Sequence, residues 1–132
     1  MAKPVSDQPR LLCIDDEVIG LKVRRAVLER AGYEVVTAPD GRTGIELFTE
    51  QLFDGVVVDF LLPDADGGQV ALQLRQIRPE VPVMLLSAYP NLPDEVLDRV
   101  NCSVMKGMGT EEFLRSVDAM VKRHRSSNHA SR

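Results

Sequence analysis

The chain has 132 residues, of which 16 are basic and 20 acidic, so its formal net charge is −4. This length suits a single domain and is too short for two ordinary hydrophobic cores. The acidic balance argues against non-specific nucleic-acid binding, which needs a basic surface, and no apolar run reaches the roughly 18 residues of a membrane span.

The two cysteines, Cys13 and Cys102, lie in separate apolar runs. They are therefore expected to be buried free thiols in a reducing compartment, which favours a cytoplasmic protein. Residues 10–123 are expected to form one domain. Residues 1–9 and 124–132 carry no periodic pattern and are expected to be flexible ends.

Short apolar runs alternate with longer amphipathic segments along the chain. The runs are typical of strands buried on both faces of a parallel sheet, and they lie at residues 11–14, 33–36, 56–58, 81–86 and 102–105. Helices are predicted at residues 18–31, 41–52, 68–77, 93–100 and 110–123. Five βα units with right-handed crossovers predict an α/β fold, a doubly wound parallel sheet with helices on both faces.

Several side chains are assigned places in these helices. Val18, Leu52 and Ile77 are expected to lie on inward-facing stripes. Asp40 is expected to cap the second helix, and Asp64 or Asp66 the third.

Polar and charged side chains stand where the predicted strands end. Asp15 and Asp16 follow the first strand, Asp59 ends the third, Ser87 the fourth, and Lys106 follows the fifth. In such a sheet the carboxyl ends of the strands share one edge, where ligands bind. Two like charges about 4 Å apart repel by about 4 kcal/mol at an effective dielectric of ~20, so clustered carboxylates need cations. Mg²⁺, a hard cation that prefers oxygen ligands, suits this set better than zinc.

These residues resemble the receiver domain of bacterial two-component response regulators, in the single-domain form found in chemotaxis. The resemblance covers nearly the whole chain and depends on segments 15–16, 59–67 and 87–88 and on Lys106. It implies the flavodoxin-like (βα)5 fold with strand order 2-1-3-4-5. It also implies phosphoryl transfer from a sensor histidine kinase or phosphotransfer protein, and signalling to a downstream protein through the face of helix four, strand five and helix five.

The resemblance also implies a role for each strand-end residue. Asp59 is the phosphoacceptor. Asp16 and Asp59, with the backbone carbonyl of Leu61, bind Mg²⁺ directly, whereas Asp15 acts largely through a metal-bound water. Lys106 pairs with the phosphoryl oxygens.

The switch region departs from the family pattern. Ser87 is expected to hydrogen-bond the phosphoryl group and start the conformational change. The family often has an aromatic residue where this chain has Ser103, and a proline where it has Gly107. Tyr89 is a candidate to replace the missing aromatic side chain.

Three functions remain open at this point. The first is the phosphorylated receiver. The second is a pseudo-receiver, an interaction module that keeps the fold without the phosphorylation switch. The third, which the chain's short length and lack of a phosphate loop disfavour, is a Mg²⁺-dependent phosphatase.

Basic residues of the first helix are interpreted as a solvated face or part of a kinase-docking surface, and His124 and His129 as inert tail residues; the basic residues are Lys22, Arg24, Arg25 and Arg30.

Overall fold

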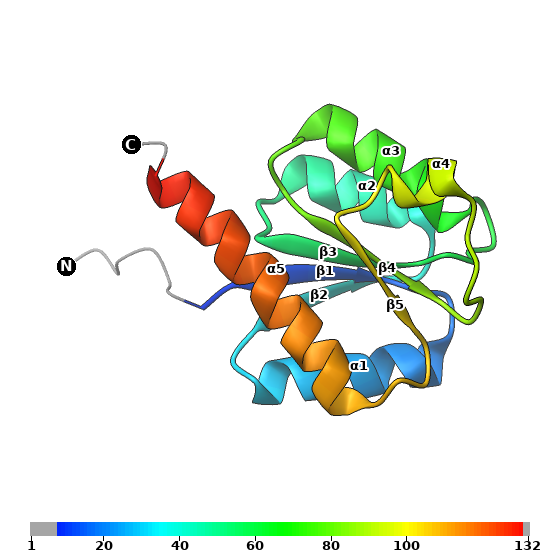
Figure 1. The fold of residues 1–132 in the computed structure, drawn as a ribbon, viewed down its shortest axis with the longest axis horizontal. Coiled ribbons are helices and arrows are strands. Elements are labelled where there is room, and N and C mark those ends of the chain that lie inside the picture. Colours follow the sequence, from blue (N-terminus) through cyan, green and yellow to red (C-terminus); the bar gives the residue numbers. More distant parts are fainter. Residues whose placement is uncertain (1–7, 131–132) are drawn as a thin grey trace.

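The structure, a computed structural model, describes the backbone of residues 8–130 and the side chains of residues 8–127. Five strands alternate with five helices (Figure 1). The elements are β1 (Arg10–Ile14), α1 (Val18–Arg30), β2 (Glu34–Ala38), α2 (Gly41–Glu50), β3 (Gly55–Asp59), α3 (Gly67–Ile77), β4 (Val83–Ser87), α4 (Asp94–Leu97), β5 (Cys102–Met105) and α5 (Thr110–Ala130).

All five strands pair in parallel in the order β2-β1-β3-β4-β5, which confirms the predicted sheet. Side chains alternate along each strand between two apolar clusters. In β1, Leu12 and Ile14 face α2, α3 and α4, whereas Leu11 and Cys13 face α1 and α5 (Figure 1). The sheet is thus covered by helices on both faces, as its continuous apolar strands indicate.

Three predicted inward positions are wrong in detail. Val18 is 64% exposed, Leu52 72% and Ile77 38%, because each lies at or beyond a helix end, where the sheet no longer covers it. The predicted helix at 93–100 shortens to Asp94–Leu97 and is followed by turns.

The prediction of a flexible tail after residue 123 is also wrong, because α5 continues to Ala130. His124 extends the buried stripe of Val117, Met120 and Val121 by one further turn and is only 8% exposed. The stripe was not recognised there because its next member is polar. Of the predicted N-terminal tail, residues 1–7 lie outside the described residues, and the carbonyl of Pro9 accepts a hydrogen bond from Glu34 N at 2.9 Å.

The expectation of buried cysteines holds for Cys13 but is wrong for Cys102, which is only half-buried. Both are free, and burial raises the pKa of Cys13 to about 12, so it stays a neutral thiol. None of the helices in the described part of the chain combines the length and apolarity needed to cross a membrane.

Candidate functional site

A pocket of about 330 Å³ opens at the carboxyl ends of the strands. It lies where the chain leaves β1, β3, β4 and β5. Its lining comes from four strand ends, namely Asp16, Glu17, Asp59, Phe60, Leu61, Leu62, Pro63, Ser87, Ala88, Tyr89 and Lys106.

Three carboxylates meet beside this pocket. Asp15, Asp16 and Asp59 each place one oxygen within 4.8 Å of the others. Asp15 and Asp59 are buried, whereas Asp16 is exposed. The predicted convergence of separate strand ends is therefore observed, and it creates the like-charge repulsion that calls for cations.

Lys106 supplies one of these cations. Its Nζ lies 2.9 Å from Asp59 Oδ2, and the Asp59 side chain is only 6% exposed. The backbone of Lys106 is held as well, because its N–H donates to the carbonyl of Ser87 at 2.8 Å. Gly107 follows with φ +91°, a conformation that proline cannot adopt, so this departure from the family pattern has a backbone cause.

Asp15 is engaged on both oxygens. Oδ1 accepts the backbone N–H of Glu17 at 2.9 Å, and Oδ2 forms an ion pair with the guanidinium of Arg24. The Arg24 side chain is 17% exposed and that of Asp15 is 2% exposed. Burial lowers the pKa of Arg24, while the nearby Cys13 and Asp59 act in the opposite direction.

Ser87 lies at the pocket but does not contact Asp59 in this state. Its buried hydroxyl accepts the backbone N–H of Tyr89 at 2.9 Å and lies 3.3 Å from the carbonyl of the same residue. The Tyr89 ring is 50% exposed and meets the Phe60 ring edge-on at 6.5 Å between centroids. Ser103 is exposed and, with Ser87 and Tyr89, lines a smaller cavity of about 100 Å³.

Backbone and capping hydrogen bonds hold both ends of the loop that contains Leu61. Asp66 caps α3 by accepting Gln69 N at 2.9 Å, in a reciprocal capping box, which confirms one of the two predicted caps. Leu61 bridges to Asp66, and Gly67 N donates to the carbonyl of Phe60 at 2.7 Å. These bonds fix the chain directly after Asp59.

Asp64, the other predicted cap of α3, instead holds the start of α2. Its carboxylate accepts the backbone N–H groups of Gly41 and Arg42 at 3.0 and 2.9 Å, and these hydrogen bonds hold the pKa of Asp64 below its ordinary value. Asp40 caps α2 as predicted, accepting Thr43 N at 2.7 Å.

Sequence reasoning missed Arg24, which it grouped with the solvated cations of the first helix. Nothing in the helical pattern separates Arg24 from Arg25. The available signal was the burial expected for Asp15: a carboxylate directly after a core strand requires a positive partner, and α1 is the next element.

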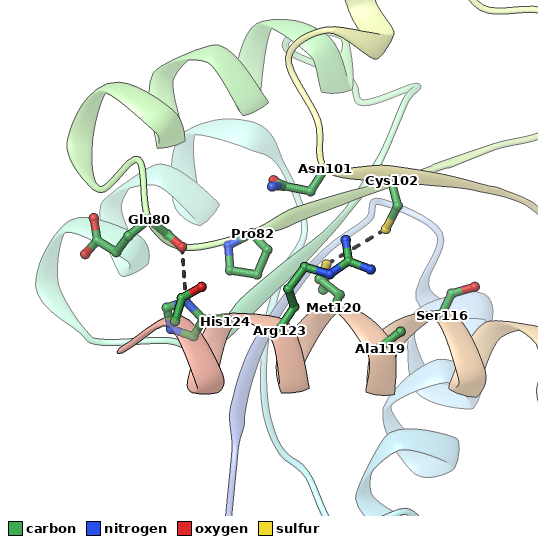
Figure 2. A pocket seen from close by; sticks show the side chains of 10 residues that line it. Glu80, Pro82, Asn101, Cys102, Ser116, Ala119, Met120, Arg123 and His124 are labelled. Carbon is green, nitrogen blue, oxygen red and sulfur yellow. Dashed lines mark hydrogen bonds between the residues drawn. The ribbon is translucent and has the colours of Figure 1, made fainter. Parts of the chain in front are cut away.

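A groove larger than the first pocket lies at the opposite end of the sheet, between α5 and the starts of β4 and β5 (Figure 2). Its volume is about 490 Å³, and Glu80, Pro82, Asn101 and Cys102 form one wall. His124 lines the other wall and hydrogen-bonds through Nδ1 to the Glu80 carbonyl at 3.0 Å. Because a carbonyl only accepts, Nδ1 carries the proton, and His124 fastens α5 to the loop before β4. Within the described part of the chain, the cluster of possible metal ligands lies at the first pocket and not in this groove.

The donor set of the first pocket fits a hard divalent cation. Its nearest donors are carboxylate and carbonyl oxygens, and none of its lining residues is a histidine or a cysteine. Oxygen ligands that leave room for water and phosphate suit Mg²⁺.

The chain resembles known proteins over most of its length. It is 33% identical over 119 residues to the alkaline phosphatase synthesis transcriptional regulatory protein PhoP of Bacillus subtilis, covering 86% of this chain and 47% of that protein. It is 30% identical over 119 residues to the transcriptional regulatory protein RprY of Bacteroides fragilis, covering 87% and 50%. The chain thus spans about half the length of these curated relatives.

Solved structures share the fold. A CheY-like response regulator receiver domain protein from Methanospirillum hungatei superposes with a TM-score of 0.87 at 22% identity, covering 92% of this chain and 99% of that one. The response regulator protein TrrA from Thermotoga maritima, in complex with Mg(2+)-BeF, gives a TM-score of 0.82 at 25% identity, covering 86% and 99%. The family model of the response regulator receiver domain matches residues 11–118. With its strand order and its acidic cluster at the strand ends, this chain belongs to the receiver domain family of two-component response regulators.

Proposed function

We propose that Asp59 accepts a phosphoryl group from a phosphohistidine of a histidine kinase or phosphotransfer protein. The main support for this proposal is the position of Asp59. Its Oδ2 lies 2.9 Å from Lys106 Nζ, and one carboxylate oxygen each of Asp15 and Asp16 lies within 4.8 Å of an Asp59 oxygen. An Asp59 oxygen attacks phosphorus, the phosphorus–nitrogen bond breaks, and the electron pair leaves with the imidazole. The product is an aspartyl phosphate.

Each residue of the pocket has its own role in this phosphoryl transfer. Asp16, Asp59 and the carbonyl of Leu61 would hold Mg²⁺ directly, and Asp15 would act through a bound water. When bound, Mg²⁺ neutralises charge on the carboxylates and on the phosphoryl oxygens. Lys106 holds Asp59 before transfer and is placed to pair with a phosphoryl oxygen afterwards.

Ser87 and Tyr89 form the proposed switch. A phosphoryl group on Asp59 offers the Ser87 hydroxyl an acceptor stronger than the carbonyl of residue 89, so the local turn at 87–89 opens. The cavity beside Ser103 gives the Tyr89 side chain room to move inward. Because the chain has only two tyrosines, fluorotyrosine labelling should give two ¹⁹F signals. Beryllofluoride should shift the Tyr89 signal and leave that of buried Tyr33 in place; an unchanged Tyr89 signal would contradict the switch.

The partner surface proposed for the kinase adjoins the pocket. Val18, Ile19 and Val23 on α1 are 64%, 77% and 56% exposed, and Met108 after β5 is 56% exposed. This apolar surface, beside Lys22, suits a helical partner that brings its histidine to Asp59.

Acetyl phosphate with Mg²⁺, followed by intact mass measurement, tests the proposal. We expect one phosphate adduct on the wild type, none on Asp59→Asn, and an unchanged adduct on Asp54→Asn. Asp54 is a matched control because it lies just before the same strand, and its carboxylate accepts Arg10 N at the opposite end.

The pseudo-receiver is the second candidate, and the glycine after Lys106 and the exposed Ser103 are the observations in its favour. A wild type without any adduct would support it. Repeated release of phosphate from a generic ester would support the phosphatase instead.

A further inference from the structure

Arg24 stands apart from the other cations of α1. Arg25, the next residue, is 49% exposed and pairs with Glu29 on the same helix. Arg24 instead turns inward, is 17% exposed, and pairs with Asp15, which lies beyond the start of the helix and beside the phosphoacceptor pocket. A charge buried to this extent requires a specific partner, and among the described side chains Arg24 forms its ion pair with Asp15.

A glycine of the helix lies beside this contact. A Cβ on Gly20 would lie 3.4 and 3.5 Å from the two terminal nitrogens of Arg24, and 2.7 Å from Glu17 Oε1. Glycine inside a helix costs about 1 kcal/mol relative to alanine. The space above Gly20 is therefore taken by the guanidinium of Arg24 and the carboxylate of Glu17.

The pair changes the charge of the acidic cluster. Asp15, Asp16 and Asp59 carry three negative charges, and Lys106 offsets one of them. Arg24 offsets a second, at the carboxylate that Lys106 does not reach. A positive charge at this place repels a dication bound beside the cluster, and it occupies the Asp15 oxygen that a metal-bound water would use.

We propose that Arg24 is an internal counter-ion of the cluster that competes with the divalent cation for Asp15. It keeps the buried carboxylate paired when no metal is bound, and it weakens metal binding in return. This proposal rests on the divalent-cation part of the proposed function. It assigns Arg24 a positioning role, since its guanidinium acts on the metal and on Asp59 through Asp15.

The structure offers a place for the displaced guanidinium. A second cavity of about 330 Å³ lies between α1 and the β5–α5 loop, and Arg24, Lys106 and Phe113 all contribute to its lining. Movement of Arg24 away from Asp15 leads into this cavity. Metal binding is thereby coupled to the surface formed by α1 and the β5–α5 loop.

Calorimetric titration of the full chain with MgCl₂ tests the competition, with Arg24→Met as the variant and Arg25→Met as the control that removes the same charge from the next position. We expect Arg24→Met to bind Mg²⁺ about tenfold more tightly and Arg25→Met to match the wild type. Without metal, Arg24→Met should melt at a lower temperature than Arg25→Met, and saturating Mg²⁺ should restore more of its stability. Arg24→Lys should give an intermediate dissociation constant.

Equal or weaker Mg²⁺ binding by Arg24→Met would overturn the proposal, because a purely structural arginine would only lower affinity when removed. A wild type that binds no Mg²⁺ would overturn the proposed metal function as well, which separates the two failures. If Arg24→Met does not fold, NMR spectra of the wild type test the competition instead. The Arg24 Nε–H signal should move with the same Mg²⁺ midpoint as the backbone signal of Asp59, and an unmoved signal rejects the competition.

Discussion

Gly67 packs against the backbone of the phosphoacceptor Asp59, and its replacement by alanine should displace that backbone. A Cβ at this position would lie 2.6 Å from the carbonyl oxygen of Asp59 and 2.9 Å from the Cα of Phe60. Non-bonded atoms prefer about 3.5–4.0 Å, so the backbone after β3 must move. Overpacking of this kind lowers the free energy of unfolding by about 1–3 kcal/mol, and the higher helix propensity of alanine offsets at most about 1 kcal/mol of that loss.

We therefore expect Gly67→Ala to lower the free energy of unfolding by about 1–2 kcal/mol and to slow formation of the phosphate adduct. Gly68→Ala is the matched control. The atoms nearest to its Cβ would be side-chain atoms at longer distances, Asp66 Oδ1 at 3.1 Å and Val96 Cγ1 at 3.2 Å, so a smaller displacement is needed. Urea denaturation followed by circular dichroism gives both free energies, and acetyl phosphate labelling gives the rates. Equal stability of the two variants, or an unaltered labelling rate in Gly67→Ala, would refute the reasoning.

Three further predictions concern Asp64, His124 and Leu61. Two backbone hydrogen bonds lower the pKa of Asp64 in the folded state, so its stabilising contribution is present above the ordinary value of 3.8 and is lost as the pH falls through the lower folded-state pKa. In chemical denaturation, the wild type should accordingly keep its stability advantage over Asp64→Asn above pH 3.8 and lose it as the pH falls further; a constant difference would contradict this. His124→Ala removes the hydrogen bond to Glu80 and should cost about 1–3 kcal/mol, against almost nothing for exposed Lys122→Ala, in the same assay. Leu61 is 54% exposed at the pocket and cannot orient a water molecule, so Leu61→Asn should hasten loss of phosphate from Asp59, measured as the decay of the adduct.

The sheet and the strand-end residues could be predicted from the sequence because both depend on local pattern. Apolar runs without alternation predict parallel strands, and the residue after each run then lies at a known edge. Asp59 and Lys106 could be placed together in this way although 47 positions separate them. The order of the strands came with the family resemblance.

The remaining features depend on long-range contacts that no local pattern records. Asp64 caps α2, 23 residues earlier in the chain, rather than the helix that follows it. Arg24 acquires its role only through the position of Asp15 across the start of α1. His124 is buried because the loop at Glu80 reaches over it, which a sequence-based tail assignment could not show.

The length of α5 has a mechanical consequence. The helix begins three residues after Gly107 and runs for 21 residues, which is roughly 30 Å at 1.5 Å per residue (Figure 1). A tilt of about 5° at its first turn would carry its far end through roughly 2.6 Å over that length. A rearrangement of a few tenths of an ångström around Lys106 that tilted α5 would thus be enlarged toward its last turns, and it would have to strain the hydrogen bond between His124 and the Glu80 carbonyl.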